Sequence, residues 1–270
     1  MNETVTPDAK RRGGRRERRD LRTRPDHAML PTLAGQLPLT EPMDQEQIER
    51  IDAASLDILE EVGVVFRDDI ALEDWRKAGA DVRGERVHLD RGLVKSLIKT
   101  IPSEITLHAR NPEKTVALGG RQSIFIPMTG APYLRDLEDV RRSPTLDDLA
   151  TFHKLAHMLP AMHSSAHHIV EPMDHPISHR HLRITHSSML YSDKTFMGMT
   201  TSGQNAEDVL DMCAILFGEE YLETHAVVTG NCNGNSPLVW DETMLSAMRA
   251  FNRRNQPVLC SPFVLGGANT

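Results

Sequence analysis

The chain has 270 residues, a formal net charge of −7 at pH 7, 39% hydrophobic residues and 26% charged residues. This balance is ordinary for a water-soluble globular protein, and it fits one large domain or a small domain beside a larger one. No apolar run has the length of a membrane span or a signal segment, which argues against membrane and secretory classes. The three cysteines, Cys213, Cys232 and Cys260, form no Cys-x-x-Cys pair, so we expect a reducing, cytoplasmic location.

The first 24 residues are strongly basic, with nine basic and four acidic side chains and therefore a local charge of +5. A basic arm of this kind can bind nucleic acid, an anionic membrane surface or an acidic partner protein. Because the arm lacks interleaved aromatic residues and an apolar face, we predict a disordered, solvated tail that binds neither nucleic acid nor membrane. The stretch from Pro25 to Pro42 has no clear periodicity and is interpreted as a linker or an extended strap. Residues 1–43 thus form a first region of basic tail and linker.

Residues 44–121 show short helix and strand patterns in alternation, which is typical of a small α+β region. Asp44 followed by Gln47 predicts a helix start with a capping box, and Gly63 predicts the end of that helix. Further helices are expected at 69–78 and 91–100, and strands at 64–66, 87–89, 105–109 and 115–118. We interpret this region as a cap that precedes a larger domain.

From residue 122 to the last residue, apolar runs alternate with amphipathic helical patterns. Strands are expected at 123–127, 162–170, 195–199, about 226–230 and about 257–265, and helices at 145–158, 177–191, 205–217 and 241–255. Helical crossovers return a chain to a parallel neighbour, so the pattern predicts about five β/α units of a parallel sheet. A doubly wound open sheet is the competing fold, and the absence of a Gly-x-Gly-x-x-Gly turn after a strand counts against it.

Polar loops with unusual residues follow these expected strands. Tyr133-Leu-Arg-Asp136 lies in the loop after the first strand, and Asn231-Cys-Asn-Gly-Asn-Ser-Pro237 follows the fourth. A second Gly/Asn loop, 266–270, follows the fifth strand. In parallel barrels, loops at the carboxyl ends of strands build the active site.

These segments, in this order, resemble the trimethylamine–corrinoid methyltransferase family, which includes relatives acting on glycine betaine and similar quaternary amines. The opening run Ile58-Leu-Glu-Glu-Val-Gly-Val and the later run Pro262-Phe-Val-Leu-Gly-Gly-Ala add to the resemblance, which extends from about Gln45 to the last residue. It implies an α/β fold with a (β/α)8 TIM-type barrel, here incomplete over residues 122–270 and preceded by the α+β region. Members of the family are much longer, so we expect this chain to be a fragment or a truncated reading frame.

The resemblance also implies a chemistry. A methyl group would move from a methylated amine, preferably a quaternary one such as glycine betaine, to the cobalt of a corrinoid (cobalamin) carried by a separate protein. The expected partners are therefore a corrinoid protein and a small methylated amine, with no cofactor bound directly, and we also expect a homo-oligomer. A quaternary substrate leaves as a neutral amine and needs no general acid, so no catalytic residue is assigned. The trimethylamine branch carries pyrrolysine in a later part of the barrel, and the sequence leaves the branch open.

Holding a cation requires an aromatic face or a carboxylate. Tyr133 is the candidate ring, and Asp136 or Asp174 is the candidate charge. The alternative is that Tyr133 packs within its loop and that Asp136 caps it. His167 and His168 fall near the carboxyl end of a strand, where one of them is expected to point into the barrel mouth.

Asn231, Asn233 and Asn235 are candidates for orienting a substrate carboxylate or the edge of the corrinoid. Their alternative role is turn formation, since Asn and Gly tolerate left-handed backbone, and that alternative is strongest for Asn233 and Gly234. The turn at 192–194 lies at the opposite end of the expected barrel, so we expect it to tolerate substitution.

Nine histidines lie between residues 153 and 186. His153 and His157 have the i, i+4 spacing that can place two imidazoles on one metal ion. Because the Glu of a His-Glu-x-x-His site is missing, we expect no metal site and assign most of these histidines to capping, surface or core positions. Two rival functions remain open: an amine- or betaine-binding protein without turnover, and a metal-dependent hydrolase using the histidine cluster.

Overall fold

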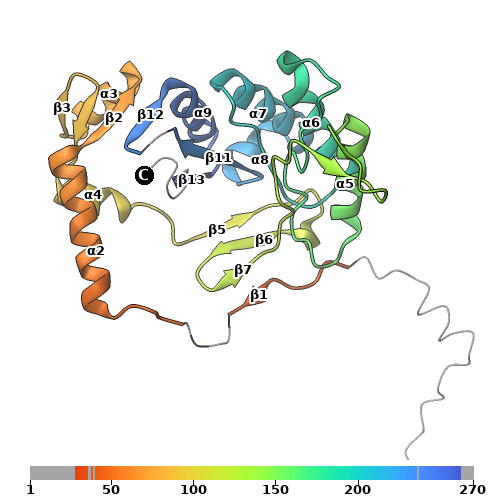
Figure 1. The fold of residues 1–270 in the computed structure, drawn as a ribbon, viewed down its shortest axis with the longest axis horizontal. Helices are drawn as coiled ribbons and strands as arrows, with labels where there is room; N and C mark the ends of the chain where they lie inside the picture. Colours follow the sequence, from red (N-terminus) through yellow and green to blue (C-terminus); the bar gives the residue numbers. More distant parts are fainter. Residues whose placement is uncertain (1–27, 36–37, 39, 236, 263–270) are drawn as a thin grey trace, which may run out of the picture.

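The structure, a computed structural model, describes residues 28–35, 38, 40–235 and 237–262. Figure 1 shows a helical layer beside short parallel strands in the second half of the chain, and a smaller mixed region at the edge of this layer. The predicted basic tail over residues 1–24 and the Gly/Asn loop at 266–270 lie outside the described residues. Within the described ranges, no helix combines the length and hydropathy needed to cross a membrane.

An extended strap runs along the first described residues (Figure 1). Strand β1 (Leu33–Ala34) pairs antiparallel with β7 (Gln122–Ser123). The amide of Leu30 also donates to the carbonyl of Pro160 over 2.9 Å. The strap interpretation is thus confirmed for this part of the chain, because its backbone is bonded to two distant segments.

Helix α2 (Gln45–Asp57) begins at the predicted capping box. The Asp44 carboxylate accepts from the Gln47 amide over 2.8 Å, and the Gln47 side chain accepts from the Asp44 amide over 3.0 Å. The helix continues as the π turn η1 (Ile58–Val62) and stops at Gly63, whose φ is 73°. A Cβ at that glycine would lie 2.7 Å from the carbonyl oxygen of Val87, so a side chain there would clash with backbone.

The smaller region packs short helices on a mixed sheet, in which β12 (Val239–Asp241) lies at one edge and is followed by β2, β4 and β3. Its elements are β2 (Val64–Arg67), α3 (Asp69–Lys77), β3 (Asp81–Arg83), β4 (Arg86–His88) and α4 (Arg91–Ile98), followed by β5 (Glu104–Leu107), η2 (Pro112–Lys114) and β6 (Val116–Gly119). The core of this region contains Phe66, Leu72 and Val87. The predicted helices and strands of residues 44–121 are confirmed to within a few residues.

This sheet receives a strand that the sequence did not predict. Strand β12 (Val239–Asp241) comes from the second half of the chain and pairs parallel with β2. The Arg249 guanidinium also donates twice to the Asp68 carboxylate, over 2.9 and 2.6 Å. The two halves therefore share one sheet and a bidentate ion pair, although the expected boundary at residue 121 separates them.

The second half contains three parallel strands in chain order. These are β10 (Phe196–Met197), β11 (Val228–Gly234) and β13 (Val258–Pro262). Two isolated parallel bridges extend this order beyond β10. Ser164 pairs with Thr195, which places the segment 164–170 beside β10, and Ala131 pairs with Val170, which places the segment around Ala131 next to it. Five segments thus follow one another in sequence order, as the expected β/α units require. The closure of these units into a (β/α)8 barrel stays a prediction.

Helices separate these strands. They are α5 (Leu146–Met158), α6 (Ile177–Tyr191), α7 (Gly203–Phe217), α8 (Glu219–Thr224) and α9 (Glu242–Arg253). Helix α5 contacts α6, α6 contacts α7, and α7 contacts α9, so these four pack side by side in chain order (Figure 1). Thr145 and Asp148 form the predicted capping box of α5, and α6 has the predicted bounds.

Two of the expected strands are less regular than predicted. Over 123–127, only Ser123 belongs to a ladder, and that ladder is the antiparallel one with β1. Pro127 has no amide hydrogen and cannot donate to a ladder. The segment 162–170 forms only isolated bridges, and Ala166 interrupts it with a φ of 55°. The chain then forms a small hairpin of β8 (Leu134–Arg135) and β9 (Arg141–Arg142).

The hydrophobic core lies between the parallel strands and the helices. Phe251 of α9, Val209 of α7 and Val228 of β11 are fully buried there. Gly198 lets these groups approach the backbone, because a Cβ at that position would lie 2.9 Å from the Phe251 ring. Full burial of each large apolar side chain contributes about 1.5–3 kcal/mol to folding.

The turn at 192–194 is heavily bonded, which argues against the expected tolerance to substitution. Lys194 is 2% exposed, and its Nζ donates to three backbone carbonyls, those of Ala156, Leu159 and Met162, over 2.7–2.8 Å. Asp193 forms an ion pair with Lys114 over 2.5 Å. The ammonium group therefore satisfies carbonyls at the carboxyl end of α5, where helix carbonyls lack amide partners.

Candidate functional site

Strand β11 separates an apolar side from a polar side. The Cys232 side chain lies on the helix side, where it is fully buried in the core. Successive residues of a strand point to opposite faces, so Thr229, Asn231 and Asn233 point to the other face. We call this the inner face and define it by Thr229, Asn231, Asn233 and their strand neighbour Ser261.

The asparagines belong to the strand, and the prediction of a loop from Asn231 onward is wrong. Strand β11 extends to Gly234, because β13 pairs with it from Gly230↔Val258 to Gly234↔Pro262. The turn interpretation of Asn233 and Gly234 is therefore also wrong. Asn235 follows the strand and bonds to the Asp241 carboxylate, so it joins β11 to the N-cap of α9. Ser236 lies outside the described residues.

Hydrogen bonds on the inner face come from neighbouring strands. The Ser261 hydroxyl donates to Asn233 Oδ1 and lies 3.3 Å from Asn231 Oδ1. Thr200 Oγ1, after β10, donates to the carbonyl of Asn231 over 2.5 Å. The Thr229 hydroxyl is buried and has no hydrogen-bond partner among the described residues. Sequence reasoning missed Thr229 and Ser261, which continuing the period-2 pattern through both strands would have placed on this face.

His167 and His168 meet on the segment between α5 and α6. Their Nδ1 atoms lie 2.7 Å apart. His167 is 2% exposed, whereas His168 is only partly buried. A Cβ atom added to Gly130 would lie 3.5 Å from His168 Nε2. The His168 ring therefore reaches the neighbouring segment that contains Gly130. The expectation that one of the pair faces the mouth of a barrel stays a prediction.

Two further histidines of the cluster have structural partners. His153 bonds to the Ser187 hydroxyl and to the carbonyl of His167, and His181 bonds to Asp208. Burial lowers the pKa of His153, His167 and His168, so these rings are neutral at neutral pH. In the described ranges, no three His, Cys, Asp or Glu side chains are grouped as metal ligands.

Tyr133 lies at the base of the β8–β9 hairpin, and this residue is half exposed. The Arg141 guanidinium carbon lies 3.8 Å from the ring centroid, so a protein cation already covers one face of the ring. The Asp136 carboxylate accepts from the amides of Glu138 and Val140 over 3.1 and 2.9 Å. Asp136 thus caps the hairpin turn, as in the alternative role, while the substrate role of Tyr133 stays a prediction.

Asp174 reaches the start of α5. Its carboxylate accepts from the Leu146 amide over 3.0 Å, at the amino end of the helix where amides lack partners. Parallel pairing places the loops of Tyr133 and His167 at the same end of the sheet, because Gly130 donates to the carbonyl of His168 and Ala131 pairs with Val170. Tyr133 and Asp174 therefore follow the paired residues Ala131 and Val170, whereas His167 and His168 precede Val170 and Asn231 and Asn233 lie within β11.

The cysteines provide no activated thiol. Burial raises the pKa of the Cys232 thiol to about 11 and also raises those of Cys213 and Cys260. A nucleophilic cysteine needs a thiolate near neutral pH, which these three environments disfavour.

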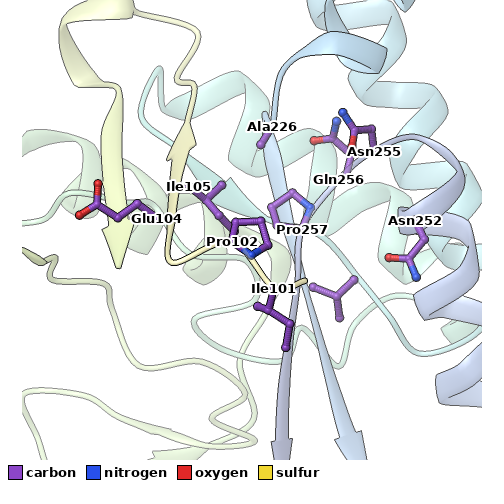
Figure 2. Close-up of a pocket in the computed structure, with 10 residues that line it drawn as sticks. Ile101, Pro102, Glu104, Ile105, Ala226, Asn252, Asn255, Gln256 and Pro257 are labelled. Atoms are coloured by element: carbon purple, nitrogen blue, oxygen red, sulfur yellow. The ribbon is translucent and has the colours of Figure 1, made fainter. Parts of the chain in front are cut away.

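A cleft of about 550 Å³ opens at the other end of the sheet (Figure 2). Ala226 and Pro257 belong to its lining and precede β11 and β13, and Ile101, Pro102 and Ile105 form its apolar wall. Among the described residues that line it, Glu104 alone is ionisable, and Figure 2 shows its carboxylate turned away from the other side chains. The cleft lies at the amino ends of the strands, so it is not the site formed by the polar inner face.

A family model described as trimethylamine methyltransferase (MTTB) matches residues 11–270. The chain belongs to this family. It is 40% identical over 233 residues to the glycine betaine methyltransferase of Desulfitobacterium hafniense (strain Y51), a match covering 86% of this chain and 49% of that protein.

Two further relatives are more distant. The trimethylamine methyltransferase MttB of Desulfitobacterium hafniense (strain DSM 10664 / DCB-2) is 26% identical over 72% of this chain and 40% of the relative. The proline betaine:corrinoid methyltransferase of Eubacterium limosum is 27% identical over 78% of this chain and 45% of the relative. The chain spans about half the length of the relatives that it matches. The family resemblance inferred from the sequence is confirmed.

Proposed function

We propose that the protein containing this chain transfers a methyl group from a quaternary ammonium compound of the betaine class to a separate corrinoid protein. The observation that carries the proposal is the 40% identity to a glycine betaine methyltransferase, which exceeds the 26% identity to the trimethylamine enzyme. We further propose that the parallel strands form part of a (β/α)8 barrel. The chain order of the five parallel segments supports that fold.

The inner face suits binding and orientation of such a substrate. Its groups are neutral amides and hydroxyls, those of Asn231, Asn233, Ser261 and Thr229. They can hydrogen-bond a betaine carboxylate or the amide-rich rim of a corrin ring. A quaternary amine leaves as a neutral product, so the site needs orientation along an in-line path more than acid–base groups.

The corrinoid, carried by the partner protein, would supply the reduced cobalt that accepts the methyl group. This chain would contribute the substrate-binding side chains, with Tyr133 facing the cation on the ring face not covered by Arg141. The neutral His168 would lie at the strand end. Homo-oligomer formation and a cytoplasmic location belong to the same proposal.

The proposal is tested with the full protein that contains this chain. The protein is incubated with a reduced corrinoid protein and, separately, glycine betaine, proline betaine or trimethylamine. We expect the absorption spectrum of the corrinoid to change to that of its methylated form, with dimethylglycine released from glycine betaine. A reaction with trimethylamine alone would contradict the betaine assignment.

The two rival functions give different results in the same assay. A binding protein would take up betaine in calorimetry and leave the corrinoid spectrum unchanged. A metal-dependent hydrolase would contain stoichiometric zinc and lose its activity with a chelator. Either result would replace the proposed methyl transfer.

A further inference from the structure

Three segments that are far apart in the sequence meet at the imidazole ring of His163. The strap (residues 28–35) pairs with β7, as Figure 1 shows, and the chain continues from β7 through Phe125 towards the Tyr133 loop. His163 belongs to a third segment, which follows α5. His163 is 1% exposed, whereas Leu30 of the strap and Phe125 are 53% and 47% exposed.

Both nitrogens of the His163 ring bond to main-chain groups. The Phe125 amide donates to Nδ1 over 2.9 Å. A backbone amide donates and never accepts, so Nδ1 carries no proton. Nε2 lies 3.1 Å from the carbonyl oxygen of Leu30, which accepts and never donates, so Nε2 carries the proton. These two bonds define a neutral ring that is protonated on Nε2.

The main chain of His163 strengthens its contact with Phe125. The antiparallel ladder of β1 and β7 ends at Ser123, and Pro127 has no amide hydrogen to donate. The His163 amide donates to the carbonyl of Phe125 over 2.8 Å. His163 therefore holds both main-chain groups of Phe125, the amide with its side chain and the carbonyl with its own backbone.

The segment held at Phe125 leads directly to the Tyr133 loop. Its next anchors are Gly130, whose amide donates to the carbonyl of His168 over 2.7 Å, and Ala131, which pairs with Val170. Tyr133 follows two residues after Ala131. The bonds at Phe125 thus fix the start of the run whose end carries the candidate ring.

The strap is held at Leu30 in the same way. The Leu30 amide donates to the carbonyl of Pro160 over 2.9 Å, and its carbonyl accepts from His163. Pro160 and His163 both belong to the connection after α5. The strap is therefore bonded to the segment that also holds Phe125.

We propose that His163 is a positioning residue that clamps the strap and the Phe125 segment together, as a neutral ring protonated on Nε2. A proton on Nδ1 would point at the Phe125 amide hydrogen and would leave a bare Nε2 facing the Leu30 carbonyl. Both bonds would then be lost, so the clamp depends on one proton position.

The consequence for substrate binding rests on the proposed function, whereas the clamp itself does not. Loss of the Phe125 bond would displace the start of the run that carries Tyr133. Loss of the Leu30 bond would loosen the strap and leave that run in place. The two bonds of one ring should therefore have different effects on binding of a quaternary amine.

The proton position is measured by nitrogen NMR on the full protein labelled with ¹⁵N-histidine, with His163→Gln used to assign the signal. We expect a His163 ring protonated on Nε2 and bare on Nδ1 at neutral pH. A ring protonated on Nδ1, or on both nitrogens, would overturn the clamp. This measurement uses the unsubstituted protein and does not depend on how well a variant folds.

Two amide substitutions separate the bonds. His163→Asn keeps an acceptor oxygen close to the place of Nδ1, and His163→Gln keeps an NH₂ donor close to the place of Nε2. We expect hydrogen exchange at the Phe125 amide to become at least about ten-fold faster in His163→Gln alone, the effect of one hydrogen bond. Exchange at the Leu30 amide should become faster in His163→Asn alone.

The control is His179→Gln, because His179 is exposed on α6, and we expect no change at either amide. Faster exchange at both amides in both His163 variants would show general loosening and would overturn the clamp. Unchanged exchange in both variants would overturn it as well.

Turnover distinguishes this proposal from the proposed function. We expect His163→Gln to raise the KM for glycine betaine about two- to ten-fold with a smaller change in kcat, and His163→Asn to leave it nearly unchanged. An unchanged KM in His163→Gln would overturn the link to the Tyr133 loop, even if glycine betaine is a substrate. The expected exchange pattern in a protein that does not demethylate glycine betaine would support the clamp and overturn the proposed substrate class.

Discussion

The two faces of strand β11 differ in what they bury. On the helix side, Val228 and Cys232 pack with Phe251 in a fully buried apolar core. On the inner face, Asn231 and Asn233 are partly buried and bond to groups of neighbouring strands. The same seven-residue strand therefore stabilises the fold with one face and carries hydrogen-bonding groups on the other. Substitutions on the two faces should separate stability from substrate binding.

The largest effect is expected from Phe251→Ala on the helix side. The ring is fully buried, and its removal leaves a cavity between α9 and the sheet. We expect the free energy of unfolding to fall by about 3–5 kcal/mol in chemical denaturation. Leu259→Ala on the inner-face side is the control, and because Leu259 is 50% exposed we expect a loss of at most about 1 kcal/mol. Equal losses would contradict the difference between the faces.

Lys194→Met tests a polar contribution on the helix side. The substitution keeps the length of the side chain but removes the Nζ donor from three buried or partly buried carbonyls, of which that of Leu159 keeps the Met162 amide as a second donor. We expect a loss of about 3 kcal/mol in the free energy of unfolding, since each unsatisfied buried group costs about 1–3 kcal/mol and partial hydration reduces the sum. Lys154→Met is the control, because Lys154 is exposed and lies over the Tyr191 ring. A similar loss in both variants would argue against the capping role of Lys194.

The Asp68–Arg249 pair tests how far the helix layer is coupled to the smaller region. Burial raises the pKa of Asp68, but the bonds from Arg249 and from backbone amides outweigh it, and the net pKa is lowered. A lowered pKa in the folded state stabilises the fold above the unfolded value of 3.8 and loses this effect as the pH falls through the folded value.

We expect Asp68→Asn to cost about 2 kcal/mol in the free energy of unfolding at neutral pH, less than a fully buried pair because Arg249 is partly exposed. The difference from the unsubstituted protein should shrink in denaturation at about pH 3. Asp69→Asn on the exposed side of the same turn is the control. A difference that does not depend on pH would contradict the ion pair.

Tyr133→Leu tests the cation-facing ring and should leave stability nearly unchanged. If the uncovered face of the ring contacts the substrate, calorimetric binding of glycine betaine should weaken by about 0.5–2 kcal/mol. Arg141→Gln uncovers the other face and should not weaken this binding. Unchanged binding in Tyr133→Leu would assign the ring to packing against Arg141 alone.

Asn233→Ala should lower the free energy of unfolding by less than about 1 kcal/mol, because its partner Ser261 can bond to Asn231 instead. We expect Asn233→Ala to act mainly on the KM for the methylated amine, measured during turnover with the corrinoid protein. Asn252→Ala serves as the control, since Asn252 is exposed and lies beside the cleft at the opposite end of the sheet. An unfolded Asn233→Ala protein would show that the inner face is structural.

Local features of the fold followed from the sequence. The capping boxes at Asp44 and Thr145, the stop at Gly63 and the bounds of α6 were all predictable. Each depends on groups within about four residues of one another, so the sequence contains both partners of every bond. The parallel order of the strands followed from the alternation of helices and strands.

Features that join distant segments were decided by tertiary structure. The asparagine run resembles a turn until β13 supplies the ladder that extends β11 to Gly234, and β12 becomes a strand only beside β2. Lys194 resembles a surface lysine until the end of α5 is brought to its ammonium group. In each case the partner lies about 25 or more residues away, and local propensity cannot specify a hydrogen bond whose other half is supplied only by packing.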